Sequence, residues 1–309
     1  MQVVKGISNI PVLQKAIVTQ GTFDGVHVGH KKILNHVVSE AQRLDGVSVL
    51  ITFYPHPRLV IHPDDNSLKL LTTLEEKKAL LENIGLDYLI ILPFTSDISN
   101  LSPLEYVRDV IVNKLNPTKL IVGYDHRFGK NREGSITDLL KFSETFDFQV
   151  EQISAKALEE ITISSTKIRA SLAEGNVQKA NKYLGYAYQF TGKVVKGMQI
   201  GRTIGYKTAN LAMSDPLKRV PGYGIFAAKI YHKNETYLGM LSIGSNPTIP
   251  EKTESIEVNI FNFDQEIYEE TLTVELVRKI RDEIKFPDLD ALKEQLAIDK
   301  EKCLHILGD

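Results

Sequence analysis

The sequence is short of several features that would point to particular classes of protein. Its single cysteine, Cys303, excludes an internal disulfide and a metal site built from thiolates. The 37 basic and 39 acidic residues give a formal net charge of −2, so no broad basic surface for nucleic acid is indicated. No apolar run approaches the ~20 residues of a membrane-spanning helix, and residues 1–17 lack the charged-then-apolar order of a signal peptide. We therefore expect a cytoplasmic protein that binds neither nucleic acid nor a membrane.

The 309 residues are enough for two domains with separate cores, and the first half has an α/β pattern. Short apolar runs alternate with segments of helical spacing, which favours a Rossmann-like parallel sheet with helices on both faces. The expected strands are 16–19, 47–53, 88–92, 119–122 and 148–153, and the expected helices are 31–44, 74–84 and 103–115.

The second half changes character after residue 186. Five strand-like runs are separated by Gly, Asn, Asp and Pro, which favours a small antiparallel β-barrel, and a terminal helix is expected from Asp288. The runs are 188–195, 225–231, 237–243, 255–263 and 271–277. We expect one domain over 1–186 and the other over 187–309.

The most informative segment runs from Gly21 to His30, between an expected strand and an expected helix. Glycine lets the backbone approach a ligand closely, and a helix start offers unpaired N–H groups and a positive dipole end. His27 and His30 flank Gly29, so both imidazoles can face one phosphate, although a purely structural pair is the alternative. The segment lacks the Lys and Ser/Thr pair of a P-loop and instead resembles the HxGH signature of nucleotidyltransferases. We assign catalysis to His27 and His30. Phosphate contacts are assigned to their neighbours Gly21, Phe23, Asp24, Gly25 and Gly29.

A second anion site is indicated at 163–169, which reads ISSTKIR. Hydroxyls at an expected helix start, followed by cations, suit a leaving pyrophosphate. A plain helix N-cap is the alternative. The residues assigned to this site are Ser164, Ser165, Thr166 and Arg169.

Two other loops directly follow expected strands, at the sheet edge where α/β proteins bind ligands. The segment FYPHP, which contains His56, either shapes an acceptor pocket or forms a rigid turn. The loop 123–129 combines a carboxylate, a cation and aromatic rings, which suits a nucleotide or a phosphorylated aromatic acceptor; a solvated turn is the alternative. We assign acceptor or nucleotide binding to His56, Asp125, Arg127 and Phe128.

In the second half, the segment 201–210 reads GRTIGYKTAN. Gly201 and Gly205 allow a tight loop over phosphates. Thr208 and Asn210 offer the hard oxygen ligands that suit Mg²⁺ bound together with ATP. A β-turn with incidental polar residues is the alternative.

Together these segments resemble the bacterial bifunctional riboflavin kinase/FAD synthetase family over nearly the whole chain. The resemblance rests on GTFDGVHVGH, FYPHP, VGYDHRFGKNREG, ISSTKIR, GNVQKANKYLG and GRTIGYKTAN. It implies that the first domain joins FMN to the AMP moiety of ATP with release of pyrophosphate, and that the second phosphorylates riboflavin to FMN. It also implies Mg²⁺ as the cofactor of both steps and places the kinase base at Glu257.

The chain departs from the family pattern at four positions. His126 stands where an aromatic residue is usual, Lys207 where proline is usual, Asn259 where His is frequent and Asn262 where Asp is common. Because proline fixes φ, Lys207 predicts a more flexible loop. Three alternatives follow: an adenylyltransferase with weak or lost kinase activity, a non-catalytic flavin-binding protein, and an adenylyltransferase for another phosphate acceptor. A homo-oligomer is compatible with the sequence.

Overall fold

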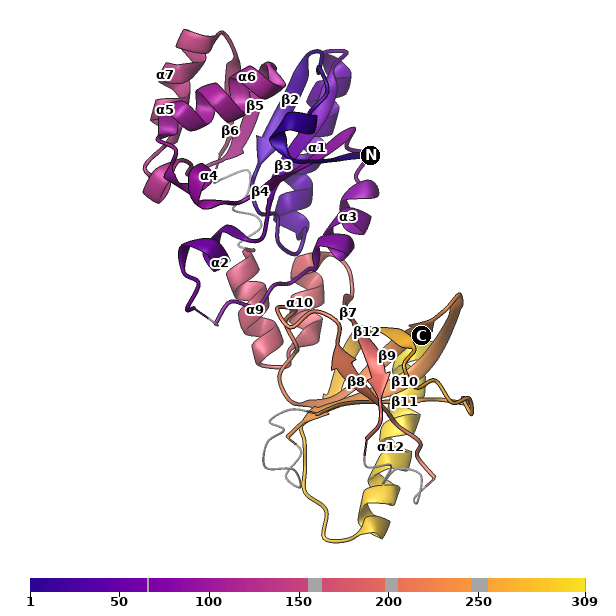
Figure 1. Cartoon of the computed structure of the whole chain (residues 1–309). Helices are drawn as coiled ribbons and strands as arrows, with labels where there is room; N and C mark the ends of the chain where they lie inside the picture. The colour runs from indigo at the N-terminus through magenta and orange to yellow at the C-terminus, as the bar shows by residue number, and fades with distance from the viewer. Residues whose placement is uncertain (66, 155–162, 198–204, 246–254, 309) are drawn as a thin grey trace. The chain divides into compact units, whose positions relative to one another are not determined.

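The computed structural model describes most of the chain, which divides into two compact units (Figure 1). Unit 1 comprises Met1–Leu68 and Thr72–Ser164, and unit 2 comprises Lys69–Leu71 and Ser165–Asp309. Each unit has a hydrophobic core of its own, as the length of the chain allows. The described residues are 1–65, 67–154, 163–197, 205–245 and 255–308.

Unit 1 is built on a parallel sheet whose described strands have the order β1-β4-β3-β2-β5-β6. The sequence predicts all of these strands except β1, whose run QVVK is too short to stand out and which pairs with β4 at the edge. The strands are β1 (Gln2–Lys5), β2 (Ala16–Gln20), β3 (Val47–Tyr54), β4 (Tyr88–Pro93), β5 (Pro117–Gly123) and β6 (Gln149–Ile153).

Both faces of this sheet are covered, because successive side chains of a strand point to opposite faces. Ile17 of β2 belongs to a buried cluster with α1 and α3, whereas its neighbour Val18 belongs to a cluster with η2 and α7. The expected α/β arrangement is therefore confirmed. The predicted helix 103–115 is interrupted, because its middle, η2, is a wider π-helical turn. The helical elements are η1 (Ile7–Asn9), α1 (Val28–Arg43), α2 (Pro57–Ile61), α3 (Leu74–Glu82), α4 (Ser96–Asn100), α5 (Pro103–Glu105), η2 (Tyr106–Val112), α6 (Asn113–Leu115), η3 (Lys130–Arg132) and α7 (Ile136–Phe146).

The strand order places the loop after β2 at a topological switch point. From β2 the chain passes through α1 to β3 and then to β4 on one side, and afterwards crosses to β5 on the other side of β2. Because β2 and β5 are neighbouring parallel strands, the loops that follow them lie next to each other at the same edge of the sheet. In open α/β sheets this is the place where ligands bind.

Unit 2 contains a closed antiparallel barrel in the order β10-β11-β8-β7-β12-β9, which confirms the predicted barrel. Alternate residues of β7 and β12 are buried, among them Tyr188, Phe190, Leu272 and Val274, as in small barrels filled by side chains. The strand β8 is not predicted by the sequence, since it begins inside the presumed loop GRTIGYKTAN. The elements of unit 2 are α9 (Ser165–Ala173), α10 (Val177–Leu184), β7 (Tyr188–Val195), β8 (Ala209–Met213), β9 (Gly224–His232), β10 (Glu235–Gly244), β11 (Ser255–Ile260), β12 (Thr271–Arg281) and α12 (Leu289–Gly308).

The expected C-terminal helix, α12, covers part of the barrel. Its Cys303 is fully buried against Ile225 and Met240 of neighbouring strands. Burial raises the pKa of the Cys303 thiol to about 12, so the cysteine acts as a small apolar side chain and not as a nucleophile. The fully buried Asp299 is paired with Arg281 of β12 at 2.7 Å, which fixes α12 to the barrel.

The division into units does not coincide with the expected domain boundary near residue 186. By its packing, the chain divides between Ser164 and Ser165, so α9 and α10 belong to unit 2. The side chain of Asn181 on α10 donates to the carbonyl of Leu276 in β12 at 2.8 Å and accepts from the N–H of Tyr188 at 2.8 Å. The expected boundary near residue 186 assigns α9 and α10 to the first functional domain, and this assignment stays a prediction.

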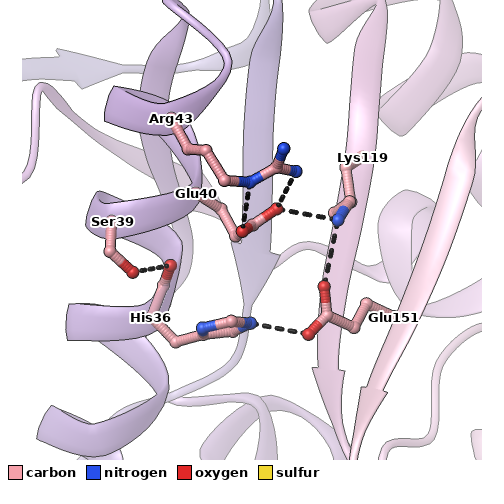
Figure 2. A network of polar contacts seen from close by, with 6 residues as sticks. All are labelled: His36, Ser39, Glu40, Arg43, Lys119 and Glu151. Atoms are coloured by element: carbon pink, nitrogen blue, oxygen red, sulfur yellow. Dashed lines mark hydrogen bonds and ion pairs between the residues drawn. The ribbon is translucent and has the colours of Figure 1, made fainter.

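A network of charged side chains ties α1 to β5 and β6 (Figure 2). Lys119 Nζ contacts Glu40 at 2.8 Å and Glu151 at 3.1 Å; Arg43 also binds Glu40, and His36 Nε2 lies 2.6 Å from Glu151. Hydrogen bonds from Arg43 and Lys119 lower the pKa of Glu40 to about 2. Burial raises the pKa of Glu151, but hydrogen bonds from His36 and Lys119 outweigh it and lower that pKa overall. The network therefore holds α1 against the sheet most strongly when both carboxylates are ionised.

We expect Lys119→Met to destabilise unit 1 by about 1–2 kcal/mol near neutral pH, because Glu40 and Glu151 lose a shared partner. A depressed carboxyl pKa stabilises the fold above the unfolded value of about 4.3, and this contribution is lost as pH falls through the folded value. The difference in unfolding free energy between variant and wild type should therefore shrink below about pH 4. Urea denaturation across this range measures it, with the exposed Lys114→Met as control. A difference independent of pH would show that Lys119 contributes packing instead of ion pairs.

Candidate active sites

The segment from Gly21 to Val26 links β2 to α1 with an unusual backbone. Phe23, Gly25 and Val26 have φ values of 44°, 83° and 35°, in the left-handed region. This region suits glycine but is costly for a β-branched residue such as Val26. Strain of this kind persists only where surrounding contacts hold it, and it collects at functional sites. The segment is therefore a stronger candidate for ligand binding than for a simple connection.

Buried polar contacts hold this loop in place. Asp24 Oδ1 accepts from the backbone N–H and the hydroxyl of Thr72 at 3.1 and 3.2 Å, and that hydroxyl accepts from the N–H of Gly25 at 3.1 Å. Lys77 Nζ donates to the carbonyl of Thr22 at 2.7 Å. Burial lowers the pKa of Lys77. Asp24 thus fixes the loop, and its predicted phosphate contact stays a prediction; Thr72 and Lys77 belong to the site although the sequence did not single them out.

The two predicted catalytic histidines lie together at the start of α1. His27 is the N-cap, and its Nδ1 accepts from the N–H of His30 at 3.3 Å. The two rings stack with centroids 3.6 Å apart and an interplanar angle of 14°. The Phe23 ring lies 4.8 Å from that of His30. A Cβ at Gly29 would come within 3.3 Å of the His27 ring, so glycine is what lets the ring lie here.

His30 is held in its neutral form. Burial lowers its pKa well below the usual value, and the nearby charges of His27 and Lys77 act in the same direction. Its Nδ1 is buried and has no hydrogen-bond partner among the described residues. A neutral imidazole with an unsatisfied nitrogen can donate or accept one hydrogen bond to a ligand, according to its tautomer.

A second group of buried polar residues joins the loops after β2 and β5. The Tyr106 hydroxyl donates to Gln20 Oε1 at 2.5 Å, and Gln20 Nε2 lies 2.8 Å from His126 Nε2. Because the amide oxygen of Gln20 is already used, its NH₂ donates and His126 accepts, which assigns the ring proton of His126 to Nδ1. Burial lowers the pKa of His126 to about 4 and keeps the ring able to accept. The unusual His126 is thus a half-buried link across the switch point.

The predicted acceptor residues occupy different environments. Asp125 and Arg127 are exposed in the loop after β5. Phe128 is buried 6.1 Å from the ring of Tyr106 and pairs with the backbone of Gly134, which indicates support of the loop. His56 follows β3 and caps α2, its Nδ1 accepting from a backbone N–H at 3.2 Å. A role of any of them in ligand binding stays a prediction.

The ISSTKIR segment begins a helix, as expected. Ser165 is the first residue of α9, with Ser164 just before it and Thr166 exposed in the first turn. Arg169 Nε donates to the carbonyl of Lys69 at 2.7 Å. Ser164 belongs to unit 1 and the others to unit 2, so their joint use with the histidines stays a prediction.

The predicted kinase residues of unit 2 meet on two neighbouring strands. Glu257 of β11 is paired in register with Asn210 of β8, and the Thr208 hydroxyl donates to Glu257 Oε2 at 3.0 Å. Gly205 is exposed with φ of 83°, a conformation that favours glycine. The predicted Gly201 lies outside the described residues.

Thr208 lies where two cavities of unit 2 meet. A cavity of about 280 Å³ is lined by Glu257, Thr208 and mostly apolar or aromatic side chains, among them Met240 and Phe286. A smaller cavity of about 70 Å³ is lined by Thr208, Asn210, Lys207 and other residues of β8 and β11. Glu257 thus lines a largely apolar cavity that also contains Glu283 and Arg281, and the Thr208 hydroxyl lines both this cavity and the smaller one.

The unusual residues around this site hold the loop before β8. Asn259 Nδ2 donates to the carbonyl of Lys207 at 2.7 Å, and Lys207 Nζ pairs with Asp264. The hydrogen bond from Lys207 lowers the pKa of Asp264. The flexibility expected from the missing proline is therefore countered by two side-chain contacts at Lys207 itself.

Two family models match the chain, one in each half. A model for FAD synthetase matches residues 9–167, and a model for riboflavin kinase matches residues 184–307. Several curated relatives carry the name bifunctional riboflavin kinase/FMN adenylyltransferase, among them proteins from three bacteria. The protein from Buchnera aphidicola subsp. Schizaphis graminum is 35% identical over 97% of both chains. The protein from Listeria monocytogenes is 35% identical over 92% of this chain and 90% of its own chain. The protein from Escherichia coli K12 is 33% identical over 100% of this chain and 98% of its own chain.

A solved structure also resembles the chain over nearly its full length. It is described as a macrolide-efflux protein from Streptococcus pneumoniae, is 31% identical, and matches with a TM-score of 0.85 over 97% of each chain. Among the residues described here, no helix has the length and apolar character needed to span a membrane.

Proposed function

Since this chain belongs to the bifunctional riboflavin kinase/FMN adenylyltransferase family, we propose that it makes both flavin nucleotides. The barrel of unit 2 phosphorylates riboflavin with ATP to give FMN and ADP. The α/β unit then joins FMN to the AMP moiety of a second ATP, giving FAD and pyrophosphate. The chain is thus a transferase with two activities. The single observation that best supports the kinase half is the hydrogen bond between Thr208 and Glu257 beside two adjoining cavities.

In the kinase reaction, Glu257 acts as the general base. It takes the proton of the ribityl 5′-hydroxyl as that oxygen attacks the γ-phosphorus of ATP. The larger, apolar cavity suits the flavin ring and contains Glu257, whereas the smaller cavity takes the phosphate end of the nucleotide. The Thr208 hydroxyl orients the carboxylate between the two.

Enzymes that transfer phosphoryl and nucleotidyl groups generally use a divalent metal, and we assign Mg²⁺ to this one. The donors available at the kinase site are the hard oxygens of Thr208 and Asn210. Among the described residues no group of three or more His, Cys, Asp or Glu could hold a metal. Such a site fits Mg²⁺, which is commonly held by one or two protein oxygens and completed by substrate phosphates. When bound, the ion neutralises phosphate charge.

In the adenylyl transfer, the protein needs to position ATP and stabilise charge, and no covalent intermediate is required. The neutral His30 and its stacked partner His27 donate hydrogen bonds to the phosphates at the start of α1. The strained backbone of the loop before them lets glycine N–H groups approach the same phosphates. We assign contact with FMN to Asp125 and Arg127, which are exposed in the loop after β5, the strand next to β2. The other ATP contacts assigned from the sequence to this site are Gly21, Phe23, Asp24, Gly25, Gly29, Ser164, Ser165, Thr166 and Arg169. Gly201 and Gly205 are assigned to ATP at the kinase site.

A chromatographic assay of the purified protein with riboflavin, ATP and Mg²⁺ tests both halves. We expect FMN to appear first and FAD to follow. A parallel reaction supplied with FMN instead of riboflavin isolates the second step. FAD from FMN but no product from riboflavin would leave an adenylyltransferase without kinase activity. Flavin binding without consumption of ATP in either reaction would contradict the proposed enzyme.

A further inference from the structure

A third cavity of unit 2, of about 560 Å³, shares no lining residue with the two kinase cavities. It lies at the C-terminal ends of α9 and β8 and against the segment 216–223 that leads into β9. The kinase residue Asn210 is near the opposite end of β8. The described lining includes three cations, Lys69, Lys218 and Arg219, and no acidic residue.

The cations of this cavity are held in place by the backbone. Leu70 forms a parallel bridge with Lys218, and the N–H of Arg219 donates to the carbonyl of Leu70 at 2.8 Å. Lys69 Nζ donates to a carbonyl of the facing segment at 2.8 Å, and Lys218 Nζ donates to the carbonyl of Leu71 at 2.7 Å. A site organised in this way needs little ordering when a ligand binds.

Arg219 is the residue that points to a ligand. Its Nε is buried and has no hydrogen-bond partner within the part of the chain that the structure describes. Leaving a buried donor without a hydrogen bond costs free energy, and the cost is larger when the group is charged, so native structures seldom do so without reason. Beside it the residue Lys218 is 4% exposed, and its ammonium lies 4.5 Å from the centre of the Tyr188 ring. Two poorly solvated cations make the cavity electropositive, which favours an anion.

We propose that this cavity is a binding site for a phosphate-bearing small molecule, held by Arg219, Lys218 and Lys69 and separate from the two kinase cavities. The guanidinium fork of arginine matches two oxygens of a phosphate, and charged hydrogen bonds of this kind are the stronger ones. Three cations suit the double charge of a phosphate better than the single charge of a carboxylate. The half-exposed Tyr223 at the edge of the cavity adds a surface for an organic portion of the ligand. The ligand that carries this phosphate is either inorganic pyrophosphate or an organic phosphate monoester.

Calorimetric titration of the full-length protein with pyrophosphate and, separately, with ribose 5-phosphate tests this site. Arg219→Gln removes the charge but keeps the carbonyl that accepts from the Tyr188 hydroxyl at 2.6 Å. Lys69→Gln is the second variant and leaves the buried cations intact. The matched control is Lys302→Gln, which removes the same charge from an exposed position on α12. Because Arg219 and Lys69 line neither kinase cavity, binding at the kinase site cancels in the comparison with wild type.

We expect one binding event to weaken at least about 10-fold in Arg219→Gln and in Lys69→Gln, the loss typical of a charged hydrogen bond. The control should bind as wild type does, and both variants should keep kinase activity. Tighter binding of ribose 5-phosphate than of pyrophosphate would identify an organic phosphate as the ligand, and the reverse would identify the inorganic anion. Titrations that are the same in wild type and both variants, or no binding of either probe, would overturn the proposal.

Discussion

Glu257→Gln is expected to lower the rate of FMN formation from riboflavin by about 10²–10⁴-fold, the usual contribution of a general base. Glutamine has the shape of glutamate but cannot take the proton of the ribityl hydroxyl. Its amide oxygen can still accept the hydrogen bond that Thr208 makes over 3.0 Å. The substitution therefore removes the base while the pairing of β8 and β11 is kept. FAD formation from supplied FMN should not change, because the histidines assigned to that step lie in unit 1.

Initial rates of both reactions, followed by chromatography, measure this effect. The same change at an exposed glutamate of α12, Glu301→Gln, is the control and should alter neither rate. Kinase rates close to those of wild type would show that another group takes the proton. A parallel loss of both activities would show that the substitution acts on folding.

The fold could be predicted wherever apolar side chains follow a simple period. The strands of unit 1 are buried on both faces and read as nearly continuous apolar runs, as β2 and β3 show. The barrel strands alternate instead, as β7 does. The edge strand β1 has only four residues, and β8 begins among the polar residues of the kinase motif, so neither carries a periodic signal. The π-helical turn η2 keeps a helical apolar pattern and differs only in its hydrogen bonds.

The site could be predicted only where its residues are close in sequence. His27 and His30 share one turn of helix, and Thr208 lies two residues from Asn210. Thr72 contacts Asp24 across 48 positions, and pairings at such separation are decided by the folded chain. Lys77 stands three residues after Leu74 and four before Leu81, on the helix face where the sequence predicts apolar residues. A lysine at such a position is a sequence signal that could have drawn attention to this part of the site.

Three unusual residues of the chain are accommodated by local contacts in the structure. His126 accepts from Gln20 as a neutral ring, and Asn259 donates to the carbonyl of Lys207. Asn262 follows β11 with φ of 56°, a conformation that asparagine tolerates better than most residues. Each departure is thus compatible with an intact fold around the site. In unit 2, the contact of Asn259 with Lys207 favours an intact kinase site over one that has lost its chemistry.

His30→Ala is expected to lower FAD formation from FMN by at least about 10²–10³-fold, the effect of removing one donor that stabilises charge in a transition state. The ring of His30 stacks on His27 at 3.6 Å, so alanine removes both a phosphate contact and the surface that orients its partner. The backbone N–H of residue 30 is kept in the variant and can still donate its hydrogen bond to His27 Nδ1. FMN formation by unit 2 should stay at the wild-type rate, and the exposed His62→Ala should leave both rates unchanged.

The pH dependence and a conservative variant separate the roles that His30 could have. Because burial holds its pKa well below the usual value, His30 is neutral at physiological pH and should protonate only in acid. Its contribution to adenylyl transfer should therefore be constant around neutrality and fall as pH is lowered. His30→Gln, which keeps a neutral donor, should restore part of the rate lost in His30→Ala. Two results would contradict the neutral pair: a rise in activity as pH falls below the usual histidine pKa, or restoration of the rate by His30→Arg but not by His30→Gln. Either result would show that a charged imidazolium binds the phosphate.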